Sequence, residues 1–287
     1  MDVSIIIVNY NTKELTVDCI RSIYAAENKY SFEIYLVDNN SSDGSVEAVR
    51  EKFPEVKVIS NKLNAGFSKA NNQAIRLASG RYTLLLNSDT IVKNRSIDTM
   101  ISYMDSHQDV GASGCKVTLP DGKLDKACHR GFPTPSASMY YFLGLDERFP
   151  NNPRFNGYHL NHLDFDQIHE IDCLVGAFMI VRREAIKEVG MLDEEYFMYG
   201  EDIDWCFRIK NAGWKITYNP EAEIIHYKGA SSRKKPIKIV YEFHRAMYLF
   251  HKKNLSFNYS KLVNLIVVTG IAAKLGLALM KNLIKNN

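Results

Sequence analysis

The chain has 287 residues, of which 46% are hydrophobic, and its formal net charge is +3. This length suffices for one large domain or for a domain with an appendage, and the hydrophobic share excludes a largely disordered chain. The small net charge gives no argument for a nucleic-acid partner. The five cysteines are odd in number and lack CxxC spacing, which argues against a disulfide framework or a structural zinc site and fits a reducing cytoplasm. The N-terminus carries no signal-peptide pattern.

The first hundred residues alternate between strand-like and helix-like patterns. Residues 3–8 are β-branched and apolar on both faces, as in a central parallel strand, and Asn11 and Thr12 can cap the helix after them. This alternation predicts βαβ units and an α/β fold, with a right-handed, doubly wound, mostly parallel sheet flanked by helices. The other elements expected here are strands at 33–37, 56–59 and 82–86, a helix from Ser45, a helix from Asn64 to about Ser79 with Gly80 as its C-cap, and a helix at 95–104.

The regular alternation of strand-like and helix-like patterns ends after residue 110. The stretch 129–170 is irregular, aromatic and rich in proline and asparagine, and loops of that length inside a compact domain usually carry function. The elements expected around it are a strand at 111–117, a turn at 119–122, a strand at 171–181 interrupted by Gly176, a short helix from Glu184, a helix at 202–211 stopped by Gly213, and short strands at 215–218 and 223–225 that lead to His226.

The C-terminal segment is a long apolar run. Residues 262–284 approach the length of a membrane span, with Lys274 near the middle. The lysines inside and around this run favour an amphipathic helix that lies in the membrane interface over one that crosses it. The basic residues Arg233, Lys234, Lys235 and Lys238 add attraction to anionic lipid, although they also suit a solvated surface. The alternative is a helix docked on the core or on a second subunit, which leaves a homodimer possible.

Polar residues follow the first two expected strands. Asp38 closes the second strand, where a carboxylate can accept from a pyrimidine N–H or a ribose hydroxyl, or can cap the turn through Asp43. Tyr10 can stack on a base or pack at the sheet edge. A helix N-terminus, which attracts phosphate, lies among Asn64, Gly66, Phe67 and Asn71, and the glycine permits close approach of backbone to ligand.

A second group of polar residues suits a divalent cation. Asp89 follows a buried strand, and Mg²⁺ typically takes one or two carboxylates together with substrate phosphates. The segment Asn87-Ser88-Asp89 has one carboxylate and needs another ligand, which His226 can supply, because imidazole suits Mn²⁺. A lone histidine is more often an ordinary core or surface group.

Three acids begin the helix expected at 202–211. Glu201, Asp202 and Asp204 repel one another, and this repulsion raises at least one pKa toward a value that suits a general base. The alternative interpretation is favourable capping of a helix N-terminus by acids. Tyr199 and Trp205 beside them fit a shaped pocket, with Trp205 on its acceptor side, although aromatic residues also simply pack.

Five segments together resemble a known family. In chain order they read VSIIIVNYN, LVDNNSSDGS, NAGFSKANNQAI, LLLNSDT, and the long stretch from VGAFMIV to HYKGAS. As a set they resemble the family-2 inverting glycosyltransferases of the GT-A (Rossmann-like) fold, and most closely the bacterial rhamnosyltransferase-like branch. The resemblance runs from about Val3 to Ser232.

The resemblance implies a role for each matching residue. Asp38 would bind the nucleobase, helped by Tyr10 and the backbone near Val8, and Asp202 would be the catalytic base, supported by Glu201. Asn87-Ser88-Asp89 stands where the family has its DXD motif, and the asparagine at its first position weakens metal binding. The remaining implied roles are the nucleotide pocket for Asn64, Gly66, Phe67 and Asn71, the acceptor side for Gly176 and Ala177, and Mn²⁺ or Mg²⁺ binding for Asp89 and His226.

The implied activity is transfer of a sugar, such as rhamnose or another 6-deoxysugar, from a dTDP- or UDP-linked donor. The acceptor would be a glycan or a lipid-linked glycan in bacterial cell-surface polysaccharide synthesis, at the inner face of the cell membrane. The predicted domains are a glycosyltransferase domain at 1–232, with a nucleotide-sugar half at 1–110 and an acceptor and catalytic half at 111–232, and a helical, membrane-associating extension at 233–287.

Other functions stay open on the sequence. Asn87 allows a nucleotide-sugar-binding or assembly protein that has lost catalysis, although the intact Glu201-Asp202 pair argues against it. A nucleotidyltransferase would carry a glycine-rich basic phosphate loop where this chain has residues 9–12. A membrane scaffold acting through the C-terminal helix alone would leave the acidic residues unexplained.

Overall fold

The computed structural model of the chain describes residues 1–26, 29–229 and 237–286. Its strands are β1 (Val3–Asn9), β2 (Phe32–Asp38), β3 (Lys57–Ser60), β4 (Tyr82–Asn87), β5 (Thr90–Val92), β6 (Val110–Thr118), β7 (His169–Glu170), β8 (Phe178–Arg182) and β9 (Lys215–His226). Its α-helices are α1 (Lys13–Ala25), α2 (Ser45–Lys52), α3 (Phe67–Ile75), α4 (Ser96–Ser106), α5 (Pro135–Phe142), α6 (Leu145–Arg148), α7 (Arg183–Val189), α8 (Glu201–Asn211), α9 (Ile237–Phe250) and α10 (Lys261–Asn286).

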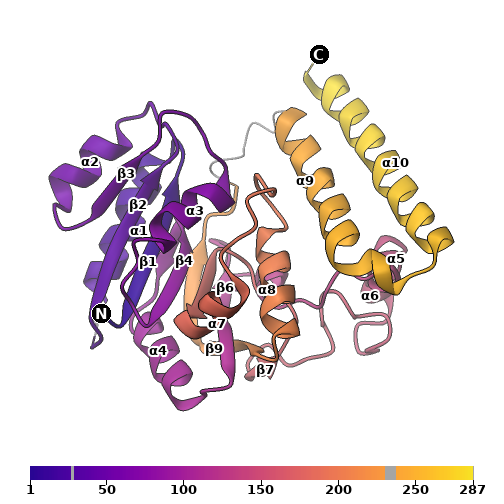
Figure 1. Cartoon of the computed structure of the whole chain (residues 1–287), viewed down its shortest axis with the longest axis horizontal. Coiled ribbons are helices and arrows are strands. Elements are labelled where there is room, and N and C mark those ends of the chain that lie inside the picture. The colour runs from indigo at the N-terminus through magenta and orange to yellow at the C-terminus, as the bar shows by residue number, and fades with distance from the viewer. Residues whose placement is uncertain (27–28, 230–236, 287) are drawn as a thin grey trace.

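One sheet forms the centre of the molecule, with strand order β3-β2-β1-β4-β8-β6-β9-β5 and β7 paired to β9 beside this path. Helices flank the sheet, and α9 and α10 stand together at the side away from β3 (Figure 1). The predicted α/β fold is confirmed. The parallel arrangement holds for β3-β2-β1-β4, whereas β8 runs antiparallel to both β4 and β6.

The first strand shows why the sequence folds this way. Ile5, Ile6 and Ile7 are fully buried, because β1 lies between β2 and β4 with helices over the sheet. A strand buried on both faces reads as a continuous apolar run rather than an alternating one. The parallel register pairs Val8 with both Val37 and Asn87, so the polar residues that follow these strands meet at one edge.

Several predicted boundaries are wrong. The helix expected to reach Ser79 ends at Ile75, and Gly80 is not its C-cap. Gly80 instead lies against the start of β1, where a Cβ atom would come within 2.5 Å of the Ser4 nitrogen, and its own N–H donates to Ser4 Oγ at 2.8 Å. Thr12 stands at the N-cap of α1 without capping it, because its hydroxyl donates to Asn9 Oδ1 at 2.7 Å.

The second half of the sheet also differs from expectation. The strand expected at 171–181 begins only at Phe178. The residues before it pair elsewhere, because the Ile171 N–H donates to the Ile216 carbonyl at 2.9 Å and Cys173 pairs with Arg130. The two short strands expected before His226 form one long strand, β9, whose pairing with β6 shifts register after Cys115. The irregular stretch 129–170 contains the short helices α5 and α6.

The C-terminal segment forms the predicted helix. The part of α10 from Lys261 to Asn282 is long and apolar enough to cross a membrane, by length and composition, and none of it is buried. The basic residues Arg233, Lys234 and Lys235 and the predicted boundary at 232/233 lie outside the described residues. All five cysteines are buried and carry free thiols.

Candidate active site

The donor side of the candidate site lies where β1 and β2 end. Asp38 is buried, and Asn9 Nδ2 donates to its Oδ1 at 2.8 Å. The Ser41 N–H donates to the second carboxylate oxygen at 2.8 Å, so Asp38 caps a turn, although through Ser41 rather than Asp43. A carboxylate has about four acceptor positions, and two are used here, which leaves room for a nucleobase or ribose donor. Tyr10 beside it is 39% exposed, and Val8 is half-buried.

The loop before α3 is fixed by a glycine. Gly66 has φ +85°, and a Cβ atom there would come within 2.5 Å of the Phe197 carbonyl oxygen. That carbonyl accepts from the Phe67 N–H at 2.7 Å, so the start of α3 is joined to the segment that precedes α8. Within the loop, Asn64 Oδ1 accepts from the Gly66 N–H at 3.0 Å, while buried Asn71 donates to the Phe67 carbonyl at 2.9 Å.

Asp89 and His226 are brought together by the pairing of β5 with β9. His226 Nε2 lies 3.1 Å from Asp89 Oδ1 and 3.3 Å from Asn87 Nδ2. On its other side, His226 Nδ1 lies 3.9 Å from an Asp125 oxygen, the separation of an ion pair rather than a hydrogen bond. Burial lowers the pKa of His226, but the two carboxylates outweigh burial and raise that pKa to about 9.

The Asp89–His226 pair fits part of a divalent-cation site. It supplies one carboxylate oxygen and one imidazole nitrogen, a donor set that suits Mn²⁺ better than Ca²⁺. Within the described ranges, no group of three or more His, Cys, Asp or Glu side chains surrounds a common point. Donor phosphates and water would therefore complete the coordination. Because a metal-bound imidazole is neutral, binding would displace the proton that Asp89 and Asp125 favour on His226.

Asp202 lies at the start of α8 and is held by Arg130. Arg130 Nη2 donates to Asp202 Oδ2 at 3.0 Å and to the Leu174 carbonyl at 2.7 Å. The Gly176 N–H points to the same carboxylate oxygen at 3.3 Å. The Ala177 carbonyl accepts from the Asn87 N–H at 3.1 Å. The segment 176–177 therefore contacts the predicted base at one end and the end of β4 at the other.

The other two acids of the cluster have different environments. Glu201 is buried, and its Oε2 has no hydrogen-bond partner among the described residues. Burial first, and the charge of Asp202 second, raise the pKa of Glu201 well above its usual range. Glu201 is therefore the acid of this cluster whose pKa is raised. Asp204 turns away and accepts from Arg208 at 2.8 Å and from Asn254 at 2.9 Å.

Comparison with known proteins identifies the family. The family model described as "Glycosyltransferase like family 2" matches residues 1–241, most of the chain. The chain belongs to this glycosyltransferase family. It is 29% identical over 228 residues to the N-acetylglucosaminyl-diphospho-decaprenol L-rhamnosyltransferase of Mycobacterium tuberculosis, which covers 76% of this chain and 73% of the relative. It is 28% identical over 240 residues to the rhamnosyltransferase WbbL of Escherichia coli strain K12, and this match covers 80% of this chain and 85% of the relative.

Solved structures confirm the GT-A fold of this glycosyltransferase. The mannosyltransferase PcManGT of Pyrobaculum calidifontis, solved in complex with GDP-Man and Mn²⁺, superposes with a TM-score of 0.61. The match covers 97% of this chain and 75% of that structure at 16% sequence identity. At this identity the likeness establishes the fold. With the family, it places the chain among enzymes of nucleotide-sugar glycosyl transfer in polysaccharide synthesis.

The structure of the glycosyltransferase adds Arg130 and changes the place of Trp205. Arg130 lies in the irregular stretch 129–170, and no periodic pattern or motif points to it. The one feature of the sequence that could have indicated it is a charged residue between small and aromatic neighbours. Trp205 is completely buried, and its indole N–H donates to the Gly190 carbonyl at 2.9 Å. It therefore packs in the core beneath α8 and does not line an acceptor side.

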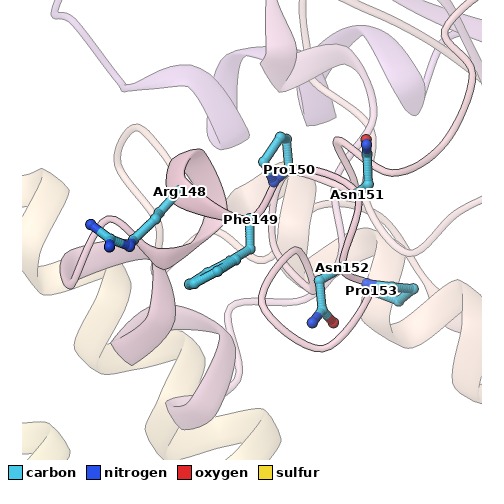
Figure 2. A pocket seen from close by; sticks show the side chains of 6 residues that line it. All are labelled: Arg148, Phe149, Pro150, Asn151, Asn152 and Pro153. Atoms are coloured by element: carbon cyan, nitrogen blue, oxygen red, sulfur yellow. The ribbon is translucent and has the colours of Figure 1, made fainter.

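A separate depression lies on the loop after α6. It is lined by Arg148, Phe149, Pro150, Asn151, Asn152 and Pro153, six consecutive residues. Figure 2 shows the Arg148 side chain pointing away from the two asparagines. None of the residues predicted for the donor, the metal or the base lines this depression.

Proposed function

We propose that this glycosyltransferase moves a sugar from a nucleoside diphosphate donor with inversion at the anomeric carbon, and that Asp202 is its general base. The observation that carries the proposal is the bridge made by segment 176–177. Gly176 contacts the Asp202 carboxylate, and Ala177 contacts Asn87 at the donor edge. The predicted base and the predicted diphosphate site are thereby held on the two ends of one short segment.

The reaction follows from these positions. An acceptor hydroxyl gives its proton to Asp202 while its oxygen attacks the anomeric carbon from the face opposite the diphosphate. The bond from that carbon to the diphosphate oxygen breaks, its electron pair leaves with the nucleoside diphosphate, and the configuration inverts. The positive end of the α3 helix dipole offsets the charge of the leaving group. Asp89 and His226 would hold a divalent ion, Mn²⁺ or Mg²⁺, whose charge offsets that of the diphosphate.

The donor and acceptor are proposed by class. Two relatives named as rhamnosyltransferases support a 6-deoxysugar such as rhamnose. We propose dTDP as its carrier, with UDP sugars next. The M. tuberculosis relative is named for a diphospho-decaprenol substrate, which supports a lipid-linked acceptor at the inner face of the cell membrane. We place Asp38 and Tyr10 at the nucleobase, and Asn64, Gly66, Phe67 and Asn71 along the nucleotide.

The test is a transfer assay with dTDP-, UDP- and GDP-linked sugars and a polyprenyl-diphosphate-linked N-acetylglucosamine acceptor. We expect release of one nucleoside diphosphate only when acceptor is present, and an inverted anomeric configuration in the product by NMR. A retained configuration would overturn the mechanism. Thermal stabilisation by a donor without any transfer would favour the alternative that Asn87 keeps open, a nucleotide-sugar-binding protein without catalysis.

A further inference from the structure

Helices α5, α9 and α10 meet around Lys274. The ammonium of Lys274 lies 4.1 Å from the centroid of the Phe142 ring on α5 and 6.0 Å from that of Phe243 on α9. A cation over an aromatic face is attracted by the ring quadrupole. Lys274 is the only charged residue from 262 to 280, and it points inward, toward the protein. Lys274 is half-buried and lies on the side of α10 that faces α5 and α9.

The outer side of α10 is therefore uncharged over most of its length. Five of its large apolar side chains are between 53% and 67% exposed, and α9 packs along the opposite side. Exposed apolar residues continue onto α5 and α9, which lie beside α10 (Figure 1). We call this surface the apolar face, and it consists of Leu262, Leu265, Ile266, Leu277 and Met280 on α10, Met139, Tyr141 and Phe142 on α5, Leu143 directly after α5, and Tyr241, Phe243 and Tyr248 on α9.

The charges around the apolar face favour lipid over a second protein copy. Helix α10 contains no Asp or Glu, and Lys261 and Lys281 stand toward its two ends. Lysines that flank an apolar helix are attracted to anionic headgroups. A second copy of α10 would bring more lysines and no carboxylate to meet them. An exposed apolar surface of this extent on a soluble protein marks an interaction site.

The apolar face is connected to the start of α8. Phe243 contacts the Tyr199 ring edge-to-face, with centroids 5.6 Å apart. Ala246 packs so closely on Gly200 that a Cβ atom there would come within 3.2 Å of its methyl group. Asn254, after α9, donates to Asp204 at 2.9 Å. Helix α9 thus contributes residues to the apolar face and also contacts the turn before Asp202.

We propose that the apolar face docks on an anionic lipid surface, with Lys274 turned inward on Phe142 and Phe243, and so holds the N-terminus of α8 near the headgroup of a lipid-linked acceptor. The docking itself follows from the exposed surface and its lysines. The orientation of α8 toward an acceptor rests on the proposed function.

The test is co-sedimentation of the full chain with vesicles of phosphatidylglycerol and phosphatidylethanolamine, and with vesicles of phosphatidylcholine alone. We expect binding to the anionic vesicles and at least about tenfold weaker binding for the double variant Leu265→Glu with Leu277→Glu. The matched control is Leu77→Glu with Ile168→Glu, two exposed apolar residues outside the apolar face, and it should bind as the unchanged chain does. Equal binding by both double variants would overturn the proposal.

A labelled cysteine gives a second readout. The native cysteines are all buried, so Leu265→Cys can be labelled selectively with an environment-sensitive fluorophore. We expect a blue shift on addition of anionic vesicles, and none for the same label at Leu77→Cys. A shift that appears without vesicles and follows protein concentration would instead show a second copy on the face, and would overturn the proposal. Neither assay contains donor or acceptor, so a failure here leaves the proposed sugar transfer untouched.

Discussion

Arg130 and Asp202 form a buried ion pair, with 3.0 Å between Nη2 and Oδ2 and side-chain exposures of only 11% and 12%. Such a pair contributes little net stability, but removal of one partner leaves an uncompensated buried charge. The pair also fixes the carboxylate beside Gly176, because the same oxygen accepts from that backbone N–H. Arg130 is therefore a positioning residue for the proposed base.

Asp202→Asn should abolish most of the activity while the protein still folds, with a loss of stability because Arg130 stays buried without its charged partner. The amide keeps the shape of the carboxylate but cannot take the acceptor proton, so we expect a rate loss of roughly 10²–10⁴. The thermal shift produced by the donor should stay unchanged. The matched control is Asp204→Asn, two residues along α8, because Asp204 pairs with Arg208 and Asn254. We expect that variant to lose stability and keep its turnover number, and near-normal turnover by Asp202→Asn would remove the base assignment.

Arg130→Met should lower both stability and turnover. The variant leaves the Asp202 charge buried without its partner, and we expect a loss of about 3–5 kcal/mol in the free energy of unfolding, measured with urea. The turnover number should fall while KM for the donor stays constant, because Arg130 touches the base and not the donor edge. Arg130→Lys should recover only part of the loss, since one ammonium does not reproduce the planar fork that reaches both Leu174 and Asp202.

A double-mutant cycle separates positioning from general damage. The double variant Arg130→Met with Asp202→Asn lacks both charges. Its loss in the free energy of unfolding should therefore be smaller than the sum of the losses of the two single variants. Strict additivity of the two losses in free energy would show that the ion pair has no energetic coupling.

Glu201→Gln should change the pH dependence of stability. Burial and the charge of Asp202 raise the pKa of Glu201 in the folded protein above the ordinary value of 4.5. As pH rises past 4.5 the unfolded chain loses this proton while the folded protein keeps it, so wild-type stability falls. The variant carries no such proton. Its urea midpoint should therefore rise relative to that of the wild type as the pH increases from 5 to 8.

Glu33→Gln is the control for that experiment. Burial raises the pKa of Glu33, but Lys57, Ser4 and Ser79 outweigh burial and lower that pKa to about 2. Glu33 is therefore ionised in both states from pH 5 to pH 8, and its contribution is lost only as pH falls from 4.5 toward 2. Its replacement should lower the urea midpoint by a constant amount across the tested range. A parallel pH profile for Glu201→Gln and the wild type would contradict the raised pKa.

Substitution of the predicted cation ligands should distinguish the binding of the metal from the binding of the nucleotide. We expect Mn²⁺ to increase the thermal shift given by a nucleoside diphosphate, and chelation with EDTA to reverse it. His226→Ala and Asp89→Ala should each lose the increment due to Mn²⁺, whereas Asp121→Asn, an exposed acid on a surface turn, should keep it. A nucleotide shift that ignores Mn²⁺ in the wild type would remove both residues as ligands.

The sequence predicted the first half of the sheet well because its signals are local. An apolar run such as 3–8 forms a buried strand, and the parallel pattern then brings Asp38 and Asn87 to one edge. Arg130 could not be found this way, since its place depends on a contact across 72 positions. The contact that Lys274 makes with Phe142 could not be found from the sequence for a similar reason. Helical periodicity gives the face on which a lysine lies, but not whether Phe142 from a distant segment covers it.

Gly66→Ala should cost more than a left-handed backbone alone explains. Gly66 combines φ +85° with ψ 177°, a backbone region that residues with a side chain almost never occupy, at a cost of about 1–3 kcal/mol. A Cβ atom would also come within 2.5 Å of the Phe197 carbonyl oxygen, a backbone atom that accepts from the Phe67 N–H. We therefore expect Gly66→Ala to weaken donor binding by thermal shift as well as to lower the urea midpoint.

The matched control is Gly122→Ala. Gly122 has φ +80° in an exposed turn, and a Cβ atom there would meet nothing within 4 Å. Both glycines have a positive φ, and only Gly66 has the close contact with Phe197. If the contact matters, Gly122→Ala loses about 1–2 kcal/mol and keeps full donor binding, while Gly66→Ala loses more and binds the donor weakly. Equal losses in both variants would show that the contact with Phe197 does not hold the loop before α3, and would remove this contact as a support of donor binding.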